Sequence, residues 1–204
     1  MKVFGHPMSR SARVVWALEE AGAEYEFQKV DLMKGEARKP GYLEINPLGK
    51  VPTLVDGDLV LTESAAICTY IGERFPTAKL IPPAGTPDRA RHLSLCFFVI
   101  GELEQPLWTM AKHRFALPEK LRVPAVVDTA RREFERPTAA LAVWLDGREY
   151  LVGDGFTIAD VLVGHTLSWA RNANVPLGHD VLEDYADRML ARPALVRARE
   201  RESA

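Results

Sequence analysis

The sequence predicts two domains of different class, a small α/β domain followed by an all-α domain. Three observations support this prediction. Up to about residue 76 the apolar residues switch repeatedly between strand-like and helix-like periods. Residues 77–87 are rich in proline and other turn formers, which is typical of a linker. From residue 88 to 204 almost every apolar pattern has the helical period. We therefore expect domains at 1–76 and 88–204, joined by a linker at 77–87.

The first domain is expected to begin with a strand, a helix and a second strand. Lys2–Gly5 reads as a short strand. Ser11–Gly22 has one apolar helical face, and its glycine suits the position that ends a helix. Strand-like alternation returns in Tyr25–Leu32. This order predicts a right-handed parallel βαβ unit.

A hairpin and another helix are expected to complete the first domain. Two short apolar runs, Thr53–Val55 and Leu59–Leu61, flank Asp56-Gly57-Asp58. An Asp-Gly pair between such runs favours a hairpin, because glycine adopts positive φ at little cost. Ser64 is a natural N-cap for a helix over Ala65–Arg74. The result is one small mixed sheet covered by helices.

The second domain shows helix-start signals ahead of helical periodicity. Thr86-Pro87 has a capping residue followed by proline in the first turn. Thr157 and Asp160 fit a capping box ahead of Val161–Ala170. Apolar residues recur three or four positions apart in two long stretches: Leu93, Phe97, Ile100, Leu103 and Leu107, then Val126, Val127, Ala130, Phe134, Leu141 and Leu145.

The composition argues against several classes of function. Lys and Arg total 26 against 28 Asp and Glu, without the clustered basic charge that nucleic acids or anionic membranes require. No apolar run approaches the roughly 20 residues of a membrane span, and the N-terminus lacks signal-peptide features. We therefore expect a cytoplasmic protein. Cys68, Cys96 and the five histidines show no metal-ligand spacing, so we expect no metal and two buried cysteines.

Ser9 lies in the loop between the first strand and the first helix, close to the start of that helix. Unpaired N–H groups and the positive end of the helix dipole favour negative charge there. A hydroxyl at this point can donate a hydrogen bond to a thiolate. Both effects lower the pKa of a thiol from about 8.5 towards neutrality. Capping of the helix by Ser9 is the alternative, and Ser11 competes for the same role.

Two further segments have features of a peptide-binding site. Val51-Pro52 precedes the first hairpin strand, where proline indicates a turn or a cis bond. A cis bond would leave the Val51 main chain able to pair with an extended peptide, whereas an ordinary strand-initiating proline would not. Glu63-Ser64 marks a helix start that can bind a carboxylate, while Glu63 can meet an ammonium. A γ-glutamyl group carries both, although capping alone would also explain Ser64.

Taken together, these segments resemble the N-terminal domain of glutathione transferases, and serine-type phi-class members and their bacterial relatives most of all. The helical half carries a sequence similar to the family's helical-domain signature. The resemblance covers essentially the whole chain, and implies a thioredoxin-like domain, then a helical-bundle domain, and a homodimer. The matching segments are Gly5-His6-Pro7-Met8-Ser9, Asn46-Pro47-Leu48-Gly49-Lys50-Val51-Pro52, Leu61-Thr62-Glu63-Ser64-Ala65-Ala66-Ile67, Tyr150-Leu151-Val152-Gly153-Asp154 and Thr157-Ile158-Ala159-Asp160.

The resemblance implies a role for each candidate site residue. It assigns Ser9 to the thiolate of glutathione. Glutathione is then the co-substrate, and no prosthetic group is expected. Six positions are implied to bind the rest of the tripeptide: Val51 and Pro52 the cysteinyl unit, Glu63 and Ser64 the γ-glutamyl end, and Arg38 and Lys50 the surroundings of the glycyl carboxylate. Ala37 stands where phi members often have histidine, so one polar contact is lost or replaced there.

The second substrate is expected to be a small hydrophobic electrophile, bound against the inner face of the helical domain. Its expected contacts are Met8, Trp108, Met110 and Phe115. Two rival hypotheses keep the same fold: a non-catalytic binding or regulatory protein, and a specialised glutathione-dependent lyase, isomerase or dehalogenase. Ser9 with Glu63 and Ser64 favours an enzyme, because a scaffold does not need all three. Family members with reductase chemistry have cysteine at the position of Ser9, which argues against that activity here.

Overall fold

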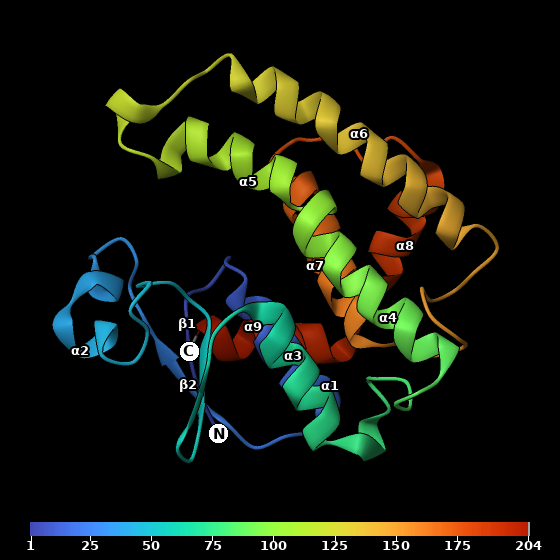
Figure 1. Cartoon of the computed structure of the whole chain (residues 1–204), viewed down its shortest axis with the longest axis horizontal. Helices are drawn as coiled ribbons and strands as arrows, with labels where there is room; N and C mark the ends of the chain where they lie inside the picture. The colour runs from blue at the N-terminus through green and yellow to red at the C-terminus, as the bar shows by residue number, and fades with distance from the viewer. Residues whose placement is uncertain (204) are drawn as a thin grey trace. The chain divides into compact units, whose positions relative to one another are not determined.

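The computed structural model describes residues 1–203 and contains two compact units (Figure 1). The first comprises Met1–Ile81 together with the C-terminal segment that begins at Ala191. The second comprises Pro82–Leu190. These limits differ from the expected domains mainly at the end of the chain, where the last helix belongs to the first unit.

The first unit is built on a four-stranded sheet with the strand order β2-β1-β3-β4. β1 and β2 are parallel, as the βαβ pattern predicts, and β3 and β4 form the predicted antiparallel hairpin. Gly57 turns the hairpin with a φ of 60°. The strands are β1 (Lys2–Gly5), β2 (Glu26–Lys29), β3 (Thr53–Asp56) and β4 (Leu59–Leu61).

Helices pack on this sheet and on each other. α1 contacts β1, and α3 contacts both α1 and β3. Gly22 ends α1 in the left-handed region, with a φ of 62°, as its position in the sequence predicts. The helical segments of this unit are α1 (Ser11–Ala21), η1 (Glu36–Arg38), α2 (Pro40–Leu43), α3 (Ser64–Arg74), η2 (Pro76–Ala78) and α9 (Pro193–Ser203).

α9 joins the first unit through ion pairs and an apolar face. Arg192 makes a bidentate pair with Glu20 of α1, with distances of 2.6 and 2.9 Å. Arg197 binds Glu19 of the same helix at 2.8 Å. Leu195, which lies between Arg192 and Arg197 in the sequence, is buried. The helical period that assigned α9 to the second domain does not reveal these partners, because they lie more than 170 positions away in the sequence.

The second unit consists of helices alone within the described residues. Thr86 caps α4, since its hydroxyl accepts a hydrogen bond from the Arg89 amide at 3.1 Å. The helices are α4 (Pro87–Phe98), the π-helical turns η3 (Val99–Leu103) and η4 (Lys112–Ala116), α5 (Gln105–Ala111), the short η5 (Glu119–Leu121), α6 (Val126–Leu145), α7 (Ile158–Asn172) and α8 (Asp180–Leu190). Across residues 1–203, no helix is both long and apolar enough to cross a membrane.

The predicted capping box at the start of α7 is present. Thr157 and Asp160 each receive a hydrogen bond from the other's main chain, and both side chains are buried. Asp160 also accepts hydrogen bonds from the Leu151 amide and from the Tyr185 hydroxyl of α8. Asp160 therefore links three segments of this unit and has a structural role.

Candidate functional site

The site begins where β1 ends. A Cβ atom on Gly5 would lie 2.6 Å from the ring of Phe27 and 2.8 Å from the Ser11 Cβ, so only glycine fits here. The chain then turns through the loop that carries Met8 and Ser9 and enters α1. This close approach brings the end of β1 against Phe27 of β2 and against Ser11 at the start of α1.

Ser9 and Ser11 occupy different environments. Ser11 is fully buried, and its hydroxyl oxygen accepts a hydrogen bond from the His6 amide at 3.1 Å. Ser9 is only half-buried; its oxygen accepts from the Ser11 amide at 3.1 Å and lies 2.6 Å from the His6 carbonyl and 2.9 Å from the Ser11 hydroxyl. A hydroxyl proton serves one acceptor at a time, and rotation can redirect it to an anion. Of the two serines, Ser9 is the one that an outside ligand can reach.

The Val51-Pro52 segment and the Ser9 loop lie at the same end of the two central strands, β1 and β3. Phe4 pairs with Thr53 in the antiparallel β1–β3 register, so residues 5–9 and 49–52 leave the sheet together. The Val51-Pro52 bond is cis. Within residues 1–203 the Val51 main chain makes no hydrogen bond. It is therefore available to pair with an extended peptide.

A buried polar cluster fixes the chain just before Val51. The Tyr42 hydroxyl donates to the Lys50 carbonyl at 2.6 Å, and the Asn46 amide donates to the same carbonyl at 2.8 Å. Both side chains also lie 3.0 Å from the Thr53 hydroxyl. The sequence interpretation assigned no role to these three residues. Asn46 belongs to a segment that carried the family resemblance, but Tyr42 has no local signal, because its partners are 8 and 11 positions away.

Gly49 supports this loop, and its replacement is expected to damage it. Its φ is 58°, and an added Cβ would lie 2.6 Å from the Ala37 carbonyl oxygen. We expect Gly49→Ala to lower the free energy of unfolding by about 2–4 kcal/mol, because the clash adds to the cost of a positive φ. Urea titration measures this change. Gly57→Ala is the control: its φ is 60° but the added Cβ meets nothing within 4 Å. Equal losses in the two variants would contradict the proposed clash.

The start of α3 offers main-chain donors at the predicted γ-glutamyl end. Glu63, and not Ser64, occupies the N-cap position, and its side chain does not cap the helix. Ser64 is the first helical residue, so the predicted capping role for it is wrong. Within the described chain, the amides of Ser64, Ala65 and Ala66 have no hydrogen-bond partner. Such amides form an anion-binding site at a helix start.

Ser64 and Glu63 are held in place by different means. The buried Ser64 hydroxyl accepts a hydrogen bond from the Arg13 guanidinium of α1 at 3.3 Å, which ties the first turns of α1 and α3 together. Glu63 is exposed and has a φ of 65°, a conformation that non-glycine residues rarely adopt. Strained residues of this kind are often found at functional sites.

Arg38 and Lys50 are both exposed on the segment that surrounds Gly49. The Arg38 guanidinium donates to the Leu48 carbonyl at 3.2 Å, which helps to fix the loop. Ala37 is buried, and its carbonyl oxygen lies close to Gly49. The structure therefore gives Arg38 a local structural contact and places Lys50 as an exposed cation on the same segment.

The four residues expected to contact the electrophile have different exposures. Met8, in the first unit, is 93% exposed and has a φ of 59°. In the second unit, Trp108 is half-buried and Phe115 is exposed. Met110 is only 2% exposed and packs in the core of that unit, which argues against direct contact with a ligand. The helical spacing did not distinguish the buried side of α5 from its exposed side.

Neither cysteine has the environment of a reactive thiol. Cys68 and Cys96 are both buried, as expected, and they form no disulfide within the described residues. Burial raises the pKa of the Cys96 thiol to about 12. His92, beside it, is also buried, and burial lowers its pKa to about 4. Within residues 1–203, no group of three or more His, Cys, Asp or Glu could hold a metal ion.

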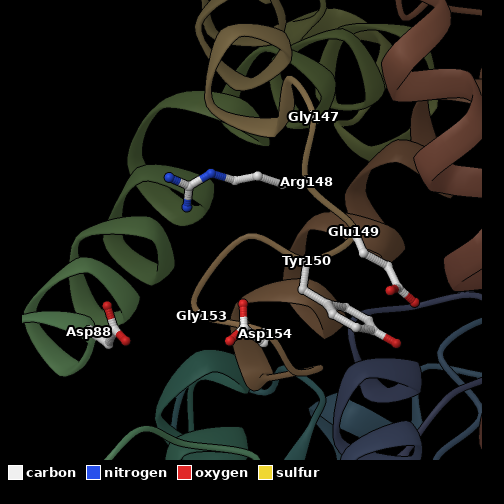
Figure 2. A pocket seen from close by; sticks show the side chains of 7 residues that line it. All are labelled: Asp88, Gly147, Arg148, Glu149, Tyr150, Gly153 and Asp154. Atoms are coloured by element: carbon white, nitrogen blue, oxygen red, sulfur yellow. The ribbon is translucent and has the colours of Figure 1, made fainter.

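A surface hollow of about 380 Å³ in the second unit is lined by none of the predicted site residues. Figure 2 shows two of its carboxylates, Asp88 on α4 and Asp154 on the loop before α7. Its polar lining differs from the mostly apolar walls of small-molecule pockets. The lining residues are Asp88, Gly147, Arg148, Glu149, Tyr150, Gly153 and Asp154.

Comparison with known proteins identifies the family. Residues 1–73 match the glutathione S-transferase N-terminal domain, and residues 105–193 match the glutathione S-transferase C-terminal domain. The probable glutathione S-transferase GSTF2 of Oryza sativa subsp. japonica is 53% identical over 170 residues, which cover 79% of this chain and 76% of that protein. The bacterial glutathione transferase BphK has a TM-score of 0.89 and 28% identity over all of both chains. A sphingomonad glutathione S-transferase complexed with glutathione has a TM-score of 0.87 and 32% identity, over 100% of this chain and 99% of that one.

The chain belongs to the glutathione S-transferase family. The predicted order of a thioredoxin-like domain and a helical domain is confirmed. Glutathione is the co-substrate of this family, as predicted.

Proposed function

We propose that this chain is an active glutathione transferase that conjugates the thiolate of glutathione to small apolar electrophiles. The observation that carries the proposal is the convergence of three elements in the first unit. The Ser9 loop and the Val51 segment leave the sheet at the same end of β1 and β3. The Arg13–Ser64 hydrogen bond joins the first turns of α1 and α3. A tripeptide bound at that end of the sheet would meet the Ser9 hydroxyl, the Val51 main chain and the start of α3.

Each of these elements suits one part of glutathione. The amides at the start of α3 and the Ser64 hydroxyl bind the γ-glutamyl carboxylate, and Glu63 binds the γ-glutamyl ammonium. The Val51 main chain pairs with the cysteinyl unit. Lys50 and Arg38 supply positive charge for the glycyl carboxylate.

Ser9 acts on the sulfur. Its hydroxyl turns from the His6 carbonyl and donates to the thiolate, and the start of α1 adds favourable electrostatic interaction. Both effects favour ionised sulfur over the thiol, so the thiol proton passes to solvent. The thiolate then forms a carbon–sulfur bond with the electrophile. In a substitution the leaving group departs with its electron pair, and in an addition the electrophile takes a proton from solvent.

We also propose that the protein acts as a homodimer in the cytoplasm. Exposed apolar side chains on α4 and α6 support this assembly, because an interface between two copies would remove them from water: Leu93, Phe97, Val143 and Trp144. Sedimentation tests it, since a single chain has a mass of 22.7 kDa. A particle of that mass at micromolar concentration would contradict the dimer.

Retention on immobilised glutathione separates a glutathione enzyme from a scaffold that has lost the ligand. We expect the native chain to be retained and Ser64→Ala to raise the KM for glutathione roughly ten- to a hundredfold, since one hydrogen bond to a charged group contributes about 1.5–3 kcal/mol. Thr69→Val is the control, because the Thr69 hydroxyl donates to the Ala65 carbonyl within α3. Steady-state kinetics with a chromogenic aryl halide measures both variants. An unchanged KM in Ser64→Ala would show that this residue does not belong to the site. If the native chain showed neither retention nor activity, the alternative of a non-catalytic binding or regulatory protein would be favoured.

A further inference from the structure

The last turn of α9 contains a carboxyl group that the proposed reaction does not use. Glu202 is only 5% exposed. Among residues 1–203, its Oε1 is the one buried side-chain oxygen or nitrogen atom without a hydrogen-bond partner. An unpaired charge is costly in such a position, so the docked helix favours the neutral carboxyl.

Glu202 lines a hollow of about 370 Å³ between α9 and the β2 segment, together with Tyr25, Phe27, Gln28, Lys29 and Arg201. The polar groups around it are largely engaged elsewhere. The Tyr25 hydroxyl donates to Glu19 of α1 at 2.8 Å, and Arg201 lies 3.8 Å from the same carboxylate and over the Tyr25 ring. The charged groups around this hollow are Arg199, which acts on Glu202 directly, and Arg201 and Lys29, which line the hollow with it. Glu19 of α1 binds the Tyr25 hydroxyl at the same place.

Burial raises the pKa of Glu202 from 4.5 to about 7, and attraction to Arg199 offsets only part of this effect. In a released helix end, the carboxyl has its ordinary pKa in water. The docked state therefore binds the proton more tightly than the released state. Linkage gives the sign: docking is strongest below about pH 4.5, weakens as the pH rises, and reaches its weakest level above about pH 7.

The rest of α9 is anchored independently of this carboxyl. The pairs of Arg192 with Glu20 and of Arg197 with Glu19, and the buried Leu195, hold the first two turns. Any release is therefore confined to the residues after Arg197. These residues cover the β2 segment that contains Phe27, whose ring lies against Gly5 at the base of the Ser9 loop.

We propose that Glu202 is a pH-sensitive switch: its neutral form keeps the last turn of α9 docked against the β2 segment, and its ionisation releases that turn. The switch operates near neutral pH and exposes the part of the β2 segment that lines this hollow. It does not depend on the proposed transferase activity.

Hydrogen–deuterium exchange of a peptide that covers 198–203, corrected for the intrinsic pH dependence of exchange, tests the switch. Between pH 5.5 and pH 8.5 we expect protection in the native chain to fall by roughly ten- to a hundredfold, since each unit of pKa gained on docking changes the equilibrium tenfold. Glu202→Gln is expected to show the same protection at both values. Glu200→Gln, which changes an exposed carboxylate on the same helix, should behave like the native chain.

Carbon-13 NMR of labelled glutamate carboxyls gives a second measurement that needs no variant to fold. A Glu202 carboxyl that titrates near pH 7 supports the switch, and one that titrates near its ordinary value overturns it. If Glu202→Gln does not fold, Glu202→Met replaces it, because it fills the space without a titratable group. The proposal also fails if protection in the native chain does not change with pH, or if the variant keeps the native pH dependence.

Discussion

Ser9→Ala is expected to lower kcat/KM for aryl halide conjugation by roughly a hundred- to a thousandfold. The basis is the loss of one hydrogen-bond donor to an anion, which costs about 2.7–4 kcal/mol at comparable positions in other enzymes. The apparent pKa of bound glutathione should rise towards that of the free thiol, about 8.5, because the remaining helix dipole stabilises the thiolate less well than dipole and hydroxyl together. The pH dependence of kcat/KM therefore shifts to higher pH, and this shift is the diagnostic measurement.

Ser11→Ala separates a chemical role from a structural one. Ser11 is buried and accepts the hydrogen bond of the His6 amide, so its loss should lower the melting temperature and leave the pH profile of kcat/KM in place. Ser9→Ala should shift the pH profile of kcat/KM, and the variant should remain bound to immobilised glutathione. If Ser9→Ala keeps the native rate and pH profile while Ser11→Ala shifts them, the thiolate donor is Ser11 and the assignment to Ser9 is wrong.

Asp160→Ala is expected to reduce the free energy of unfolding by about 3–5 kcal/mol, the largest stability effect that we expect from a single substitution here. The carboxylate accepts hydrogen bonds from the Thr157 amide at 2.8 Å, the Thr157 hydroxyl at 2.9 Å, the Leu151 amide at 3.0 Å and the Tyr185 hydroxyl at 2.7 Å. Its removal leaves several buried donors without acceptors and a cavity beside them. Urea titration followed by circular dichroism measures the change.

Asp184→Ala is the matched control for this substitution. It removes an exposed carboxylate from α8 in the same unit, so its effect should stay within about 0.5 kcal/mol. Glutathione binding by the folded fraction of Asp160→Ala should be unchanged, because Asp160 belongs to the helical unit and contacts no predicted site residue. A loss below 1 kcal/mol would show that other groups satisfy the Thr157, Leu151 and Tyr185 donors.

Features with short-range causes could be predicted from the sequence. The Asp-Gly pair sets the β3–β4 turn, Gly22 ends α1, and Thr86 caps α4, because each effect acts within about four residues. The Thr157–Asp160 capping box is equally local. The positions of Ser9 and Val51 followed from the same order of strands and helices. The family resemblance, and not the local signals, joined these positions into one expected site.

Only the tertiary structure decided which of these groups a ligand can reach. Ser9 and Ser11 are two positions apart with the same side chain, yet packing against the neighbouring strands buries one and leaves the other accessible. Met110 has an apolar side chain suited to a pocket, but the packing of its unit places it in the core. Burial depends on partners far away in the sequence, and residue type and spacing do not specify those partners.

The sequence by itself therefore determined the order and class of the elements, through apolar period, turn chemistry and caps. The tertiary structure decided that α9 packs on α1, that Tyr42 and Asn46 hold the Lys50 carbonyl, and that Glu202 is buried. The physical reason is the range of the interactions. Backbone propensities and caps act within a few residues, whereas burial and ion pairing join segments that come together only when the chain folds.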